Sequence, residues 1–249
     1  MNLTTQTSNS SQQNTALKDI EELTLSLVIQ NFNPTLLSYD FLNMSGIVPK
    51  EWELASQPII NQKGSQVSFK NGLNIIAQPN TISFIEGLGT KELKELQFAN
   101  IAQKYVEKMS NAQYQAINVI SKIITPFSED KEGGKNFIND TLLRSGVWRN
   151  FGNIIPQASV NLLYQLDECQ LGVNINPAQL QQEKNIISAV LFAGNFNYNL
   201  TTLSDEVKIT KLTEKINNWE KDLTTFRELI YQKFLQKAII EKASLFDTL

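Results

Sequence analysis

Residues 65–87, SQVSFKNGLNIIAQPNTISFIEG, contain the pattern that decides the fold class. Apolar and polar residues alternate on both sides of an Asn-Gly pair, which is typical of half-buried strands joined by a tight turn. A three-residue loop at 70–72 pairs Phe69 with Leu73 and keeps the apolar side chains on one face, whereas a two-residue turn mixes the faces. The stretch therefore predicts antiparallel strands, with Gly72 in the left-handed conformation of a bulge.

Similar patterns extend outward from this meander. The predicted strands lie at 23–29, 114–124, 160–166, 169–175 and 186–200, and the predicted helices lie at 92–109 and 135–147. In the hairpin after position 160, pairing Leu166 with Cys169 places every apolar residue on one face. These elements predict an α+β fold of antiparallel sheets with packing helices.

Changes in composition divide the chain into segments. The predicted segments are a flexible polar tail at 1–18, a first α+β half at 19–127, a linker at 128–134, a second α+β half at 135–203, and an amphipathic or coiled-coil helix at 204–246. The stretches 31–37 and 174–180 are similar to each other. This echo is compatible with two ferredoxin-like halves, and a single core is the other organisation that the pattern allows.

The C-terminal region carries the most regular pattern in the chain. Apolar residues alternate at spacings of three and four, which is the heptad spacing of one apolar seam along a helix. The seam consists of Ile209, Leu212, Ile216, Trp219, Leu223, Phe226 and Ile230. We expect a long amphipathic helix that buries this seam either against its own sheet or against another chain.

Charged residues flank the seam at the positions that face a partner helix in a coiled coil. In a parallel pair, Lys215 lies opposite Glu220 and Asp222 lies opposite Arg227, and both pairs attract. Each exposed pair contributes only about 0.5 kcal/mol. The charges would therefore select the orientation of a partner helix, while the apolar seam would supply the affinity.

The composition argues against several kinds of chemistry. The chain has no histidine, which removes His-based triads and imidazole ligands for zinc. Its one cysteine, Cys169, continues the apolar alternation of a strand and is interpreted as a small buried hydrophobe. Among the carboxylates, Glu51, Glu53, Asp167 and Glu168 are the candidates for a small-molecule enzyme, although Asp167-Glu168 is better suited to a turn. We expect no catalytic residue, no metal site and no cofactor.

Charge and hydropathy narrow the expected partners and location. A net charge of −3 argues against binding by neutralisation of nucleic-acid phosphates, and Lys135, Arg144 and Arg149 are the only notable cationic grouping. The longest apolar runs are far shorter than the roughly 20 residues of a membrane span. The first residues lack the basic start and apolar stretch of a secretory signal. We therefore expect a cytoplasmic protein that does not bind membranes.

Short motifs are distributed over roughly residues 23–200. They are NPTLL at 33–37, SGIVP at 45–49 with WELA at 52–55, NG at 71–72 with AQPN at 77–80, and AGNF at 193–196. In these motifs the chain resembles an uncharacterised family of α+β proteins common in cyanobacteria. The resemblance implies no known activity or ligand, and it leaves the C-terminal helix as an extension.

These observations favour a non-catalytic protein-interaction or assembly protein. Its partner would be a second copy or another protein, which it would bind through the C-terminal helix, because an exposed apolar seam of this length needs a covering surface. The alternative is a nucleic-acid-processing protein built on tandem ferredoxin-like halves.

Overall fold

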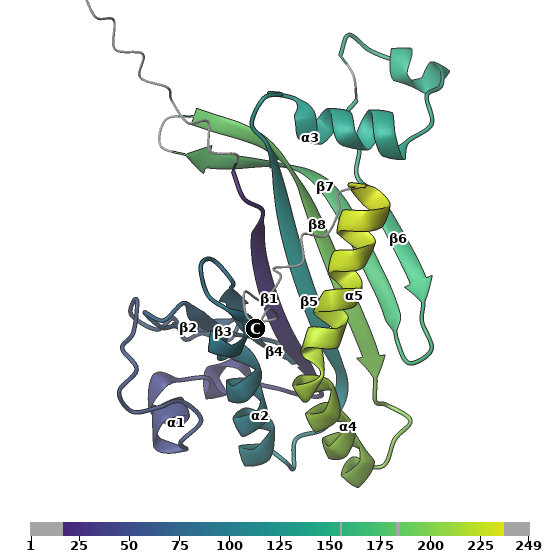
Figure 1. Ribbon diagram of the computed structural model, residues 1–249. Coiled ribbons are helices and arrows are strands. Elements are labelled where there is room, and N and C mark those ends of the chain that lie inside the picture. Colours follow the sequence, from purple (N-terminus) through teal and green to yellow (C-terminus); the bar gives the residue numbers. More distant parts are fainter. Residues whose placement is uncertain (1–16, 155, 183–184, 237–249) are drawn as a thin grey trace, which may run out of the picture.

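The computed structural model describes residues 17–154, 156–182 and 185–236, and its strands form one eight-stranded antiparallel sheet (Figure 1). The strands are β1 (Ile20–Ile29), β2 (Ser65–Ser68), β3 (Leu73–Gln78), β4 (Thr81–Gly87), β5 (Tyr114–Phe127), β6 (Val160–Gln165), β7 (Gln170–Gln182) and β8 (Asn185–Asn199). Their order across the sheet is β2-β3-β4-β1-β5-β8-β7-β6. The two edges are therefore formed by β2 and β6.

Helices α2, α4 and α5 cover one face of this sheet (Figure 1). The helices are α1 (Tyr39–Met44), α2 (Phe98–Lys108), α3 (Gly133–Asn136), α4 (Asp205–Asn217) and α5 (Trp219–Glu228). Short 3-10 turns lie at Pro34–Leu36, Leu93–Glu95 and Val147–Asn150, and π-helical segments extend α3 through Phe137–Leu142 and α5 through Leu229–Phe234. The main core lies between the helices and the covered face, where alternate strand residues such as Leu25 and Leu27 are fully buried.

The predicted register of the meander is confirmed. Val67 pairs with Ile75, and the backbone N–H of Phe69 donates to the carbonyl of Leu73 at 2.9 Å. Gly72 has φ of +95°, the left-handed conformation expected in this loop. The apolar period of two was enough to select the register because a slip by one residue would expose the whole buried row.

The prediction of two ferredoxin-like halves is wrong. The single sheet runs through both predicted halves because β5 pairs with β1 on one side and with β8 on the other. β5 also continues beyond 124, the predicted end of this strand, and passes through Pro126, which lies opposite Ala189 in the ladder. Just beyond, the predicted linker at 128–134 ends in two buried glycines, and a Cβ on Gly134 would lie 1.9 Å from the carbonyl oxygen of Ala189.

The prediction of a long C-terminal helix is also wrong. The helix is interrupted at Asn218, whose backbone (φ −101°, ψ 14°) separates α4 from α5. The longer piece, α5 together with its π-helical extension, spans 16 residues. Asn217 and Asn218 are weak helix formers, so the chain can bend where the twisted sheet requires it. Residues 237–246 of the predicted helix, and residues 1–16 of the predicted tail, lie outside the described part of the chain.

Candidate functional site

The apolar seam of the C-terminal region packs against the chain's own sheet. Its members are buried except Ile209, which is half-buried against the core. Phe226 lies directly over Gly194 of β8, where an added Cβ would be 2.4 Å from the ring, and the ring centroid of Trp219 lies 4.9 Å from that of Phe98 in α2. The coiled-coil prediction is therefore wrong, and the alternative of packing within the chain is what the structure shows.

Three of the four flanking charged residues find partners within the chain. Lys215 lies 2.6 Å from Glu168, and Arg227 donates to Glu21 of β1 at 2.6 Å. Asp222 accepts a hydrogen bond from the hydroxyl of Tyr198. The fourth residue, Glu220, is exposed. The sequence singled out these residues for pairing between chains, whereas the fold uses them to hold the helices on the sheet.

A polar pocket of about 310 Å³ lies where the β6–β7 turn meets the break between α4 and α5. Tyr198 donates its hydroxyl hydrogen to Asp222, with Oη 2.8 Å from Oδ1 and 3.0 Å from Oδ2. The ammonium of Lys215 lies 4.6 Å from the ring centroid of Tyr198, in the geometry of a cation–π contact. Cys169 also lines the pocket and is buried, as predicted.

The electrostatics of this pocket favour a structural role for these groups. Burial raises the pKa of Asp222 and that of the Cys169 thiol, so this cysteine is not an activated nucleophile. Hydrogen bonds from Lys215 and Lys211 lower the pKa of Glu168 to about 2. The contacts of Glu168 with Lys215 and of Tyr198 with Asp222 therefore hold the β6–β7 turn and strand β8 against α4 and α5.

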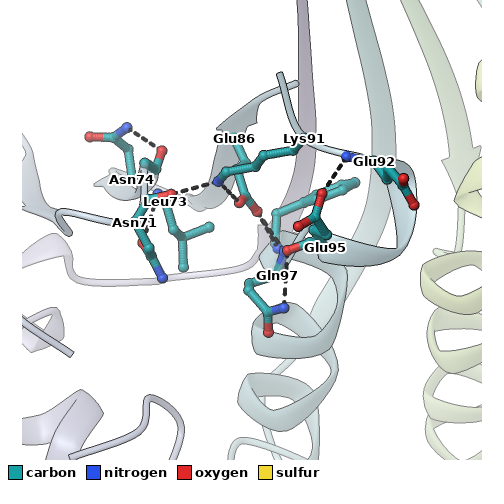
Figure 2. A network of polar contacts seen from close by, with 10 residues as sticks. Asn71, Leu73, Asn74, Glu86, Lys91, Glu92, Glu95 and Gln97 are labelled. Carbon is teal, nitrogen blue, oxygen red and sulfur yellow. Dashed lines mark hydrogen bonds and ion pairs between the residues drawn. The ribbon is translucent and has the colours of Figure 1, made fainter. Parts of the chain in front are cut away.

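A second polar cluster surrounds Glu86 on β4 (Figure 2). Its fully buried carboxylate accepts hydrogen bonds from the backbone N–H groups of Gln97 (2.6 Å) and Phe98 (2.9 Å), at the start of α2. Lys91 donates to the other oxygen at 2.5 Å. Glu86 therefore caps the N-terminus of α2 and ties it to the sheet. The sequence signal for this role is an acidic residue in phase with the buried Ile82 and Phe84.

Residues 144–154, here called the projection, extend beyond α3 at the upper right of Figure 1. Four large apolar side chains are exposed there: Val147 (90%), Trp148 (43%), Phe151 (90%) and Ile154 (80%). Arg149 contributes to the shape of the segment, because it pairs with Asp140 at 2.8 Å and lies 5.3 Å from the ring centroid of Trp148. This surface was not predicted, because residues 135–147 were expected to form a helix and no element was expected at 148–154.

The projection is also basic. It contains Arg144 and Arg149, of which Arg149 is paired with Asp140, and residues 141–166 include no aspartate or glutamate. An apolar surface with arginine and aromatic side chains has the composition of the residues that contribute most at protein interfaces. The projection is thus the candidate functional site.

No family model matches the chain, and no curated protein matches its sequence. Within residues 17–154, 156–182 and 185–236, no group of three or more metal-ligating side chains is arranged to hold a metal ion. None of the helices in these ranges is long and apolar enough to cross a membrane.

Proposed function

We propose that the chain is a non-catalytic protein-interaction or assembly protein that binds its partner through the projection. The observation that carries this proposal is the exposure of Val147, Trp148, Phe151 and Ile154 within one short segment. Burial of each large apolar side chain at an interface would contribute about 1.5–3 kcal/mol. Such a cluster is a recognised sign of a docking surface because isolated exposed residues are common and contiguous ones are not.

We propose the projection as the binding surface, instead of the C-terminal seam that the sequence analysis favoured. The seam is covered by the sheet, so it has little apolar surface to offer without unfolding. The charge of the projection selects the kind of partner: Arg149 is paired with Asp140, whereas Arg144 has no acidic residue near it in the sequence between 141 and 166. We expect a partner with an apolar pocket and an acidic rim.

A photo-activated cross-linking amino acid at position 151 tests the proposal in the cells that make the protein. The matched control carries the same cross-linker at Met44, which is 85% exposed on α1. We expect discrete protein adducts from position 151 only, reduced at least tenfold by Val147→Asp in the same chain. Identical adducts from both positions, or adducts with lipid instead of protein, would contradict the proposal.

The nucleic-acid alternative depended on tandem ferredoxin-like halves. The single sheet replaces those halves, so the architecture on which this alternative was based is not present.

A further inference from the structure

The two edges of the sheet are protected to very different degrees. The outer edge of β2 is covered by the preceding loop: Ile59 and Gln66 exchange two backbone hydrogen bonds of 2.9 and 2.8 Å, and the N–H of Ala55 donates to the carbonyl of Ser68. At the other edge, no described residue forms a backbone hydrogen bond with the outer side of β6. The sheet is thus open on one side only, as far as the described residues extend.

The backbone groups that point outward from β6 can be identified. The N–H of Leu166 donates to the carbonyl of Cys169 at 2.9 Å, which fixes the phase of the β6–β7 ladder. Successive residues of a strand direct their backbone N–H and C=O groups to opposite sides. The backbone groups of Val160, Leu162 and Tyr164 are therefore directed toward β7. Asn161, Leu163 and Gln165 consequently direct their N–H and C=O groups away from the sheet.

The side chains of β6 do not protect this edge. Exposed edge strands usually carry a charged residue, a proline or a bulge that prevents pairing with another chain. The segment 160–166, VNLLYQL, contains no charged residue and no proline, and Leu163 is 70% exposed. Figure 1 shows that β6 lies beside α5 and not beneath it, so its helix-side residues Val160, Leu162 and Tyr164 are only half-buried.

We propose that β6 pairs antiparallel with β6 of a second copy of this chain, about a two-fold axis at Leu163. In this register Leu163 lies opposite Leu163 of the partner subunit, and Asn161 lies opposite Gln165 of the partner subunit. On the helix-side face, Leu162 lies opposite the partner subunit's Tyr164. A symmetric antiparallel pair requires a strand that matches its own reversed sequence. Counted outward from Leu163, the residues on either side follow the same order, apolar, polar, apolar.

Charge supports the antiparallel orientation. The β6–β7 turn is exposed and contains Asp167 and Glu168; because Glu168 is paired with Lys211 and Lys215, Asp167 supplies the acidic charge of the turn. Antiparallel pairing places this turn beside the residues that precede β6 in the other copy, and these belong to the stretch 141–166, which contains no aspartate or glutamate. A parallel arrangement would instead place two acidic turns side by side. The edge of β6 is a different surface from the projection, and the dimer does not require the projection to bind a partner.

Light scattering on the full chain tests the dimer. We expect a mass of twice 28.1 kDa for the wild type, and of 28.1 kDa for Leu163→Lys at the same concentration. Ile186→Lys is the matched control, because Ile186 is a strand residue with 65% exposure, and we expect it to remain dimeric. A monomeric wild type, or a Leu163→Lys variant that stays dimeric, would overturn the proposal.

Disulfide cross-linking tests the register in a Cys169→Ser background. Directly opposed residues have Cα atoms about 5.5 Å apart, within the range that a disulfide spans. Leu163→Cys should therefore form a covalent dimer on mild oxidation. Asn161→Cys should not, because the two copies of that residue would be about 14 Å apart along the strands. Equal cross-linking of both variants would refute the axis at Leu163.

Discussion

Gly194→Ala should destabilise the protein by overpacking the contact between β8 and α5. A Cβ at position 194 would lie 2.4 Å and 2.5 Å from two ring carbons of Phe226, whereas ordinary van der Waals contact begins near 3.4 Å. The ring is fully buried, so it has to move by about 1 Å within a filled core. Overpacking of this kind costs about 1–3 kcal/mol.

The expected loss of stability depends on where the contact lies in the core. Phe226 lies within α5, so moving its ring disturbs the seam on either side, and we expect a loss of about 2–3 kcal/mol in the free energy of unfolding. This corresponds to a decrease in Tm of about 4–12 °C for a chain of this size. Gly194→Ala combined with Phe226→Leu should be more stable than the sum of the two single changes predicts, because the smaller side chain makes room for the methyl group.

Urea unfolding followed by circular dichroism measures these differences. The control is Gly172→Ala on the neighbouring strand β7, where an added Cβ meets nothing within 4 Å. We expect that variant to stay within about 0.5 kcal/mol of the wild type. If Gly194→Ala is as stable as Gly172→Ala, α5 does not lie on β8, and packing of the seam within the chain is refuted.

Two further predictions concern the polar clusters. Glu86→Gln should lower the free energy of unfolding by about 3 kcal/mol in urea titrations, because Lys91 loses its buried counter-charge. The control is Glu53→Gln, which removes an exposed ion pair with Lys70, and an equally small loss for Glu86→Gln would contradict the prediction. Glu168 has its pKa lowered from 4.5 to about 2, so its stabilisation is present above pH 4.5 and is lost as the pH falls toward 2. Glu168→Gln should therefore have a lower Tm than the wild type at pH 7, with the difference disappearing near pH 2, and a difference that persists there would argue against the ion pairs with Lys211 and Lys215.

Much of the local structure could be predicted from the alternation of residues. The register of Val67 with Ile75 is as predicted, and so is the approach of Leu166 to Cys169 in the second hairpin. Both follow from placing apolar residues on one face, which is a condition on neighbours in the sequence. The candidate site could not be predicted in this way, because the exposure of Phe151 depends on where the sheet and α3 end.

The sequence by itself determined which residues share a face of each strand and each helix, because side-chain direction repeats every two residues in a strand and every 3.6 in a helix. Only the tertiary structure decided what each face meets. Phe226 packs over Gly194, and Arg227 pairs with Glu21 from the opposite end of the chain. The physical reason is that a helical apolar seam is equally favourable against any apolar surface of matching shape. The choice between this chain and another therefore depends on contacts between distant segments, which no local pattern records.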